Sequence, residues 1–329
     1  MFRKRDWIYP TPLVIVTFAP KLSDLILKQS HIVPEGTDEI RLYDYVGSVF
    51  TEIPSRSAIK KSITRGKILV DGEPAKTGTW VRPGQKIELM DLEETPPKQF
   101  NLDFKIEFQD EHFAIVHKPA GIPVSGNQFK TMQNALVGKF SKSTEVDALE
   151  WPKPVHRLDS ATSGLLIVAK TGRSLMLLGQ MFEHKEIQKK YCAVVQGKME
   201  EEGQIKFQID EKKAETNYAL VETTPSLRSN YLSLVDLYPK TGRTHQLRIH
   251  LSKLGFPIMG DTLYGREGEV LKGKGLFLCA IGLRFKHPIT DEEIIVQIDE
   301  PSKFESLMER EKKRFDKYHN NTENTEKEN

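Results

Sequence analysis

The sequence predicts an α+β protein. A small α/β domain precedes a larger domain built on a mixed, largely antiparallel β-sheet with a central cleft. Strand-like runs dominate the chain after about residue 104, and helical segments interrupt them without the strict alternation of a parallel sheet. The chain has 329 residues, 38% hydrophobic and 29% charged, which is enough for two domains with ordinary cores.

Residues 1–40 match no recognisable element, and we treat them as an N-terminal extension. The opening stretch, "MFRKRDWIYPTPLVIVTFAP", places basic residues before apolar ones, as a secretory signal does. Asp6 and three prolines interrupt it, and no small-residue cleavage site follows. We therefore interpret it as an N-terminal strand or docking segment. No run of about twenty apolar residues occurs in the sequence, so we expect no membrane span.

Residues 41–92 form the small domain. "RLYDYVGSVF", from Arg41, has the apolar spacing of a helix. "SRSAIKKSITRGKILVDGEPA", from Ser55, predicts a second helix that starts at a serine, then a strand, then a turn at Asp71 and Gly72. "VRPGQKIEL" adds another turn and strand. An acidic, proline-bearing linker over residues 93–103 follows.

The second predicted helix carries basic residues along one face. They lie at spacings of four, one and four: Arg56, Lys60, Lys61 and Arg65. Such a stripe is either a solvated helix face or a surface for phosphate groups. The net charge of +2 is too small to indicate nucleic acid by itself, so any nucleic-acid footprint must be local.

Residues 104–308 form the large domain. It opens with two strands joined by a turn in "KIEFQDEHFAIVHKPAGIPVS", followed by a short helix in "TMQNALVGKF". "GLLIVAKT" predicts a buried strand, "GRSLMLLGQMFEHKEIQ" a helix and "KKYCAVVQGKM" a further strand. "NYLSLVDLYP", "GLFLCAIGLRFKHP" and "EEIIVQIDEP" alternate as strands do. Residues 309–329 have little to bury, and we expect a disordered tail.

Three polar segments of the large domain are candidate site material. In "HRLDSATSG", Asp159 is either a turn residue paired with Arg157 or an acid exposed at a sheet edge. Tyr191, which begins a strand, is either half-buried filler or part of a site. In "TGRTHQLRIH", the density of charge suggests that alternate residues face a polar cleft.

The sequence indicates no cofactor and no metal. It contains no phosphate-binding glycine loop, dinucleotide fingerprint or zinc-ligand spacing. The histidines at 245 and 250 have no cysteine or acidic ligand at suitable spacing within their segment. Cys192 and Cys279 are far apart in apolar runs, which favours buried, reduced thiols in a cytoplasmic protein over a disulfide.

Taken together, these segments closely resemble the RluA-like family of RNA pseudouridine synthases. Its hallmark His-Arg-Leu-Asp, followed by Thr-Ser-Gly, lies at residues 156–164, and its Tyr-x-Ala-x-Val-x-Gly strand at 191–197. Its Gly-Arg-Thr-His-Gln-Leu-Arg-x-His segment lies at 242–250, its Gly-x-Pro-Ile-x-Gly-Asp turn at 255–261, and its Lys-Pro-Ala-Gly corner at 118–121. "PVSGNQF" replaces the family's usual histidine-bearing stretch after that corner. Residues 41–92 resemble the RNA-binding module named after the ribosomal S-four protein.

The resemblance implies an isomerase that converts uridine to pseudouridine in ribosomal or transfer RNA, without metal or cofactor. Asp159 would attack the anomeric carbon or remove a sugar proton, and both routes stay open. Arg248 would pair with Asp159, and Tyr191 would lie against the uracil and assist proton removal from ring carbon five. Arg157 would hold RNA backbone or fill the space of the flipped nucleotide.

The remaining expected contacts are with phosphate groups. Arg243 and Thr244 would position phosphate, although Arg243 could share the role of Arg248. Lys60, Lys61 and Arg65 would dock on RNA phosphates. The histidines at 156, 245 and 250 are interpreted as structural. We expect a monomer that acts in the cytoplasm.

Two other classes of function remain alternatives. A non-catalytic RNA-binding or ribosome-assembly factor could retain the fold, but it would have no need of a lone buried acid. A nucleoside or glycoside hydrolase would need a second carboxylic acid near Asp159. Within the motif segments, Asp261 is the one weak candidate for that acid.

Overall fold

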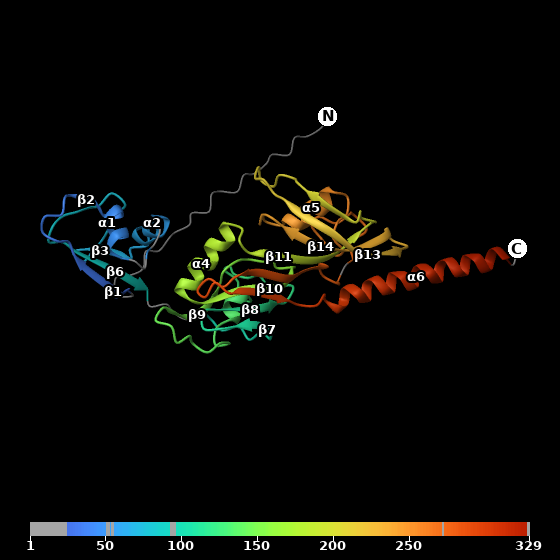
Figure 1. Cartoon of the computed structure of the whole chain (residues 1–329), viewed down its shortest axis with the longest axis horizontal. Helices are drawn as coiled ribbons and strands as arrows, with labels where there is room; N and C mark the ends of the chain where they lie inside the picture. The colour runs from blue at the N-terminus through green and yellow to red at the C-terminus, as the bar shows by residue number, and fades with distance from the viewer. Residues whose placement is uncertain (1–24, 51–52, 54–55, 93–96, 272, 328–329) are drawn as a thin grey trace, which may run out of the picture. The chain divides into compact units, whose positions relative to one another are not determined.

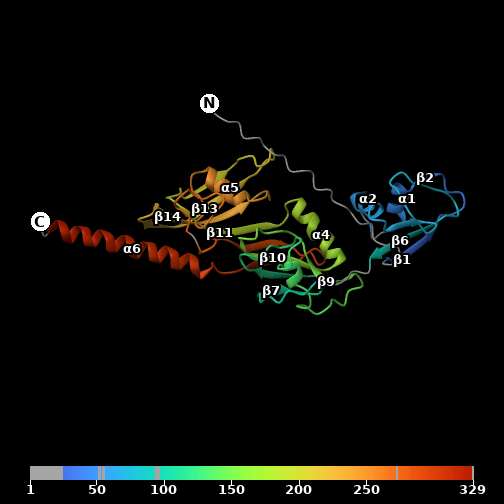
Figure 2. The same cartoon turned by 180° about the vertical axis from the view of Figure 1, so that it is seen from behind.

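The computed structural model describes residues 25–50, 53, 56–92, 97–271 and 273–327. The chain divides into two compact units, residues 1–95 and 96–329, whose elements are labelled in Figures 1 and 2. The strand or docking segment expected within residues 1–20 lies outside the described residues. No described helix is both long and apolar enough to cross a membrane.

The first unit is a small four-stranded sheet with two helices. The sheet has the order β1-β6-β3-β4, and a separate strand pair joins β2 to β5. The elements are β1 Leu25–Ile32, β2 Ile40–Arg41, α1 Leu42–Val49, α2 Arg56–Thr64, β3 Ile68–Val70, β4 Glu73–Pro74, β5 Trp80–Val81 and β6 Lys86–Leu92.

This unit begins earlier than the expected residue 41, because β1 pairs antiparallel with β6. The sequence does not reveal β1 because it is an edge strand that buries few side chains. Ile26, Leu27 and Ile32 are all exposed, so the strand lacks the apolar alternation that marks a half-buried strand. The N-terminal extension is therefore shorter than residues 1–40.

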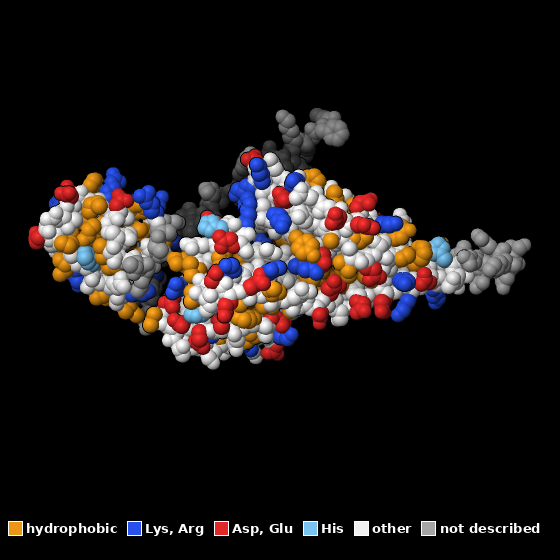
Figure 3. All heavy atoms as spheres, viewed as in Figure 1, with side chains coloured by type: hydrophobic (Ala, Val, Ile, Leu, Met, Phe, Trp, Pro, Cys, Tyr) orange, Lys and Arg blue, Asp and Glu red, His pale blue; other side chains and the backbone are white. Residues whose placement is uncertain are grey.

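Helix α2 separates an apolar face from a basic one. Ile59 and Ile63 are buried in one cluster with Leu42 and Val46 of α1. The opposite side exposes Lys60, Lys61 and Arg65, and Figure 3 shows Lys and Arg side chains over this helix. Among the described residues, no carboxylate lies within ion-pairing distance of these three cationic groups.

The second unit is built on a ten-stranded sheet of order β12-β13-β14-β11-β15-β10-β8-β7, with β16 beside β15 and β9 beside β10. Among the described residues, every pairing in this sheet is antiparallel except that of β10 with β15. The predicted α+β fold with a mixed, largely antiparallel sheet is confirmed. The elements are β7 Ile106–Gln109, β8 Phe113–Lys118, α3 Met132–Ala135, β9 Ala148–Pro154, β10 Ser163–Thr171, α4 Gly172–Glu183, β11 Gln188–Gln196, β12 Glu202–Ile205, β13 Thr216–Ser226, β14 Asn230–Pro239, α5 Gln246–Lys253, β15 Leu278–Lys286, β16 Glu293–Gln297 and α6 Ser302–Lys327.

Both faces of β10 are buried, which explains its continuous apolar run. Leu166 and Val168 pack with Met132 of α3 on one face. Leu165 and Ile167 pack on the other face with Leu178 of α4. A strand covered on both sides is a rigid support for the loop that precedes it, and that loop carries Asp159.

The structure differs from the expected disordered tail at residues 309–329, because α6 continues to Lys327. Phe304, Leu307 and Met308 bury the start of the helix in the core of the second unit. The buried Glu311 then accepts a hydrogen bond of 2.8 Å from Ser226 Oγ of β13. Low apolar content concealed this helix, since its first turns anchor it while residues 312–321 bury little.

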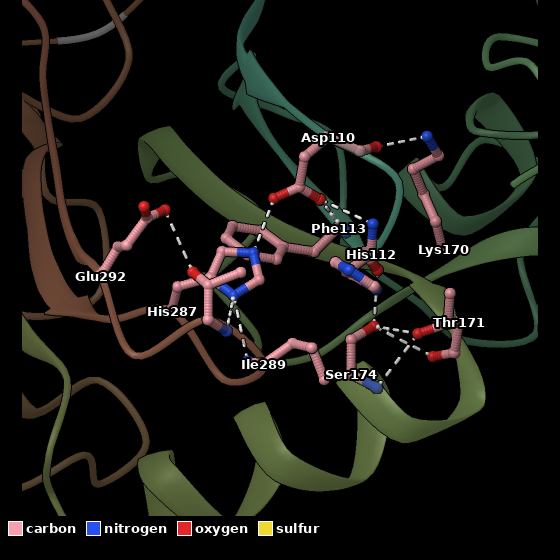
Figure 4. Close-up of polar contacts among 10 residues, drawn as sticks. Asp110, His112, Phe113, Lys170, Thr171, Ser174, His287, Ile289 and Glu292 are labelled. Carbon is pink, nitrogen blue, oxygen red and sulfur yellow. Dashed lines mark hydrogen bonds and ion pairs between the residues drawn. The ribbon is translucent and has the colours of Figure 1, made fainter. Parts of the chain in front are cut away.

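A polar cluster fixes the end of β10 to two distant turns, as Figure 4 shows. His287 Nε2 donates to Asp110 Oδ2 over 2.8 Å, while its Nδ1 accepts from two backbone amides. Lys170 Nζ, at the end of β10, donates to the backbone oxygen of Asp110. Ser174 Oγ of α4 donates to the backbone oxygen of His112. The β7–β8 turn, the β15–β16 turn and the β10–α4 junction are thereby tied together.

We expect Gly164→Ala to destabilise the second unit strongly. Gly164 has φ of +115°, and a Cβ atom there would lie 2.2 Å from the backbone oxygen of Ala280 in the parallel neighbour β15. Relieving that overlap must move backbone, so the free energy of unfolding should fall by about 3 kcal/mol or more. Thermal unfolding measures the effect. The control is Gly179→Ala on α4, where no atom lies within 4 Å and alanine favours the helix. Equal midpoints for the two variants would contradict the expectation.

Candidate active site

The second unit contains a cavity of about 290 Å³ where three of the predicted segments meet. Its walls come from the loop before β10, the start of β11 and the segment from residue 241 to residue 248. The predicted site residues that line it are Arg157, Asp159, Tyr191, Arg243, Thr244 and Arg248. The fold thus brings together residues separated by up to 91 positions in the chain, from 157 to 248.

Asp159 lies in a tight turn, where its backbone oxygen accepts from the amide of Thr162 over 3.0 Å. Its carboxylate makes no hydrogen bond to any residue that the structure describes. Two cationic or titratable groups lie within 4 Å of it: His245 Nε2 is 3.8 Å from Oδ1, and Arg248 Nη1 is 4.0 Å from Oδ2. The side chain keeps 18% exposure, so the carboxylate is accessible from the cavity and free to engage a bound group.

Lys118 supports this turn from beneath, a role that the sequence did not reveal. The side chain is fully buried, and Nζ donates to the backbone oxygens of Pro119, Ile122 and Ser160 over 2.9, 2.7 and 3.2 Å. Burial lowers the pKa of Lys118 to about 8, although the negative charge of Asp159 opposes the shift. The lysine joins the Lys-Pro-Ala-Gly corner to the Asp159 turn.

Tyr191 is half-buried near the start of β11 and packs against Leu158 and its neighbours. Burial raises the pKa of its hydroxyl, and the charge of Asp159 raises it further. The phenol therefore keeps its proton at neutral pH. It presents an aromatic surface and a hydroxyl to the cavity.

Arg248 contacts Asp159 as expected and also has a closer partner that the sequence did not predict. Its Nε and Nη2 donate to the two oxygens of Asp261 over 2.8 and 2.7 Å, a bidentate pair. Both side chains are almost completely buried, and the Arg248 guanidinium also lies over the Tyr264 ring at 5.1 Å. Burial lowers the pKa of Arg248, but the contacts with Asp261 and then Asp159 raise it overall. Asp261 holds the arginine, and the free Nη1 faces Asp159.

Asp261 cannot serve as the second acid of a hydrolase. Besides Arg248, its Oδ1 accepts from the amides of Leu263 and Tyr264 over 2.9 and 3.0 Å. Burial raises the pKa of Asp261, but the hydrogen bonds from Arg248 and from these amides lower it overall. The carboxyl is therefore ionised and occupied, with no proton for a leaving group.

The segment after Gly242 enters helix α5 at Gln246, which corrects the expectation that alternate residues face one cleft. His245 is the N-cap of α5, and Arg248 follows within its first turn. His250 points elsewhere, because residues two apart on a helix do not share a face. It is fully buried, with Nδ1 3.0 Å from Thr216 Oγ1 and Nε2 3.3 Å from the Phe207 oxygen.

His156 forms part of one wall of the cavity. Its Nε2 accepts from the amide of Ile167 over 3.0 Å, and its ring stacks on Phe182 of α4 at 4.4 Å. Burial and then the nearby Lys189 lower the pKa of His156 to about 3, so the ring is neutral at physiological pH. This histidine fixes the start of the loop against β10.

Cationic residues surround the opening of the cavity. Arg157 and Thr244 are exposed, and the exposed Arg243 donates from Nε to the backbone oxygen of Lys213 over 3.3 Å. Figure 3 shows Lys and Arg side chains gathered on the face between α4 and α5. Lys60, Lys61 and Arg65 belong to the first unit and do not line the cavity. Within the described parts of the chain, no group of three or more His, Cys, Asp or Glu side chains could hold a metal ion.

Comparisons with known proteins agree with this chemistry. The family described as RNA pseudouridylate synthase matches residues 112–253. An uncharacterized RNA pseudouridine synthase of Aquifex aeolicus is 31% identical over 83% of this chain and 94% of its own. The ribosomal large subunit pseudouridine synthase D of Vibrio cholerae is 32% identical over 77% of this chain and 86% of its own.

A solved structure shares the fold of the second unit. Human RNA pseudouridylate synthase domain containing 1 covers 60% of this chain and 84% of its own, with a TM-score of 0.51 and 25% identity. The matching family and the relatives named as synthases favour an enzyme over a binding protein without activity. The chain belongs to the RluA-like family of RNA pseudouridine synthases and is an isomerase that converts uridine to pseudouridine in RNA.

Proposed function

We propose that Asp159, Tyr191 and Arg248 carry out the isomerisation and that the substrate is a structured ribosomal RNA. The main support for the site is the Asp159 carboxylate, which is unbonded, accessible and flanked by His245 and Arg248 at about 4 Å. The support for ribosomal RNA is the similarity to a relative named for the ribosomal large subunit.

In the proposed reaction, the target nucleotide leaves its stack and places its sugar beside Asp159. Flipping a base costs a few kcal/mol, and Arg157 at the opening can occupy the space that the base leaves. The carboxylate either attacks C1′, so that the C1′–N1 bond breaks, or removes a sugar proton to give an unsaturated intermediate. The N1 atom takes the bonding electron pair in both routes. The uracil then turns and C5 bonds to C1′, as the Asp159–C1′ ester bond breaks or as Asp159 returns the proton to the sugar. Loss of the proton from C5 and gain of a proton at N1 complete the pseudouridine.

Tyr191 and Arg248 would act on different parts of this sequence. The Tyr191 ring lies against the detached uracil and limits its motion. Its hydroxyl, which keeps its proton, can give that proton to N1 as it takes the proton from C5. Arg248 stabilises the ionised Asp159 and fixes its direction through Nη1. Retention of the detached base in the cavity accounts for a product that is an isomer of the substrate.

The first unit would anchor the RNA. We propose that β1 and residues 41–92 form an S-four-like RNA-binding domain, in which exposed Lys60, Lys61 and Arg65 contact phosphates. Arg243 and Thr244 would do the same near the cavity. We further propose a monomer in the cytoplasm, where the buried thiols of Cys192 and Cys279 stay reduced.

The function is tested by mapping pseudouridines in all cellular RNA with and without this protein. Loss of one or more sites in ribosomal RNA, restored by the wild-type gene and not by an Asp159→Asn gene, would support the proposal. If pseudouridines were lost only from transfer RNA, the proposed ribosomal substrate would be wrong, whereas the assignment as a pseudouridine synthase would stand.

We expect the combined variant Lys60→Ala, Lys61→Ala and Arg65→Ala to bind RNA more weakly and with less salt dependence. Each lost phosphate contact removes roughly one unit from the slope of log K against log salt concentration, so the slope should change by about 2 to 3. RNA binding across a salt series measures it. A matched loss of three charges from α6, by alanine at Lys312, Lys313 and Lys317, is the control. If the two variants had equal slopes, the three α2 residues would not contact RNA phosphates, and this part of the proposal would be wrong.

A further inference from the structure

His245 combines an unusual backbone with an unusual position. It has φ of 54° and ψ of 20°, the left-handed region, and caps α5 without a capping hydrogen bond from its side chain. Such a conformation is uncommon for residues other than glycine, although asparagine, aspartate and histidine adopt it more often than the rest, and conformations of this kind gather at functional sites. The backbone turns the imidazole into the cavity, where it lies beside Asp159.

The imidazole spans the distance between Tyr264 and Asp159. Its Nδ1 lies 2.9 Å from the Tyr264 hydroxyl, and its Nε2 lies 3.8 Å from Asp159 Oδ1. Tyr264 is held independently of His245. Its amide donates to Asp261, its backbone oxygen accepts from Ser252 Oγ over 2.8 Å, and its ring lies beneath the Arg248 guanidinium. The hydroxyl is thus a fixed point against which the imidazole is set.

The charge of Asp159 decides which nitrogen carries the hydrogen. In a neutral imidazole one nitrogen donates and the other accepts. A lone pair on Nε2 would be repelled by the carboxylate, whereas an N–H there is attracted to it. With the hydrogen on Nε2, Nδ1 is the acceptor, and the Tyr264 hydroxyl is its donor. A hydroxyl that can rotate satisfies this arrangement without strain.

We propose that Tyr264 holds His245 in the Nε2–H form, and that His245 positions the catalytic carboxylate by directing this N–H at Asp159 Oδ1. Arg248 faces Oδ2, so the two donors together set the plane of the carboxylate for the ribose. The inference rests on the proposed role of Asp159. His245 is a positioning residue, and its effect should appear in kcat and leave KM for RNA nearly unchanged.

Two substitutions of His245 distinguish a role as hydrogen-bond donor to Asp159 from a role in the left-handed backbone alone. Glutamine keeps an amide N–H that reaches toward Asp159, whereas asparagine fits the left-handed backbone better but is too short. We expect His245→Gln to stay within about tenfold of the wild-type kcat and His245→Asn to fall at least about tenfold lower still. This is the effect of one hydrogen bond to a charged group, which forms when the 3.8 Å contact closes in the complex with RNA. A purely structural role predicts the reverse order, which would overturn the proposal.

A double-mutant cycle tests the part played by Tyr264. Tyr264→Phe should lower kcat by about five- to tenfold when residue 245 is histidine, with the unfolding midpoint and KM nearly unchanged. In the His245→Gln protein the same change should have no further effect, because an amide donor needs no neighbour to fix it. Equal losses in both backgrounds would overturn the proposal.

Asp159→Asn, assayed in parallel, distinguishes the two levels of failure. An inactive Asp159→Asn protein, with wild-type kcat in Tyr264→Phe and His245→Asn, would overturn the positioning role alone. Activity in Asp159→Asn itself would overturn the proposed function of the site. All assays use the full chain and RNA with tritium at uracil C5, and they measure tritium release.

Discussion

Asp159→Asn is expected to lower pseudouridine formation on the order of 10⁴-fold or more, while RNA affinity stays within a few-fold of the wild type. The amide is nearly the same size but neither attacks C1′ nor removes a sugar proton. Affinity should persist because the phosphate contacts come from cationic residues that the substitution leaves in place. The change also removes a negative charge beside Lys118 and Tyr191. The charge of Asp159 raises the pKa of both groups, so the pKa of each should fall in the variant.

Tritium release from RNA labelled at uracil C5 measures the first effect, and a binding titration at fixed salt measures the second. Asp210→Asn is a suitable control, since it makes the same chemical change at an exposed carboxylate of the same unit. Asp210 has φ of 49°, a conformation that asparagine accepts readily. If the Asp159→Asn variant kept activity within tenfold of the wild type, Asp159 would not be the catalytic carboxylate. Release of free uracil by the wild-type protein would indicate hydrolysis instead.

The fold class and the residues that meet in the cavity could both be predicted from the sequence, because both depend on patterns within short segments of the chain. The strand runs follow from alternation or continuous apolar character, and the motif residues occur in short segments whose order identifies the family. The same local signals place α4, since the segment "GRSLMLLGQMFEHKEIQ", predicted as a helix, contains the whole of Gly172–Glu183. None of these inferences needs knowledge of what lies across the sheet.

The partners of the motif residues could not be predicted, because they depend on distances between segments. Arg248 and Asp261 are 13 positions apart and form the bidentate pair only when the chain after α5 folds back. Lys118 reaches Ser160 over 42 positions. His245 gave no signal because its left-handed backbone, which turns the ring toward Asp159, is set by the cap of α5. The dense polar run at residues 242–250 suggests a segment in which alternate residues face one cleft, as in a strand, although it leads into α5.

Two elements that escaped prediction, β1 and the later part of α6, share a simple physical feature, namely that few of their described side chains are buried. β1 exposes Ile26 and Ile32, and residues 312–321 of α6 bury little. Periodicity in a sequence reports burial and not secondary structure itself. An edge strand or a projecting helix is stabilised by its backbone hydrogen bonds and by a few anchors, and it is therefore read as irregular or disordered.

Asp261→Ala is expected to lower the free energy of unfolding of the second unit by about 3 to 5 kcal/mol, because it leaves the buried Arg248 guanidinium without its partner. Both side chains of the pair are at most 6% exposed, so water cannot replace the lost carboxylate. Activity should fall as well, since Arg248 would no longer be held with Nη1 toward Asp159. Taken alone, however, a single variant cannot separate lost stability from lost catalysis.

The double variant Arg248→Met with Asp261→Leu separates them. Replacing a buried ion pair by apolar side chains of similar size is often neutral or stabilising, so the unfolding midpoint should recover toward that of the wild type. Tritium release should stay as low as in Asp261→Ala, because Asp159 then has no cation at Oδ2. Recovery of activity together with stability would mean that the pair serves only to hold the fold. Recovery of stability alone would assign Arg248 to the reaction, with Asp261 as the residue that aims it.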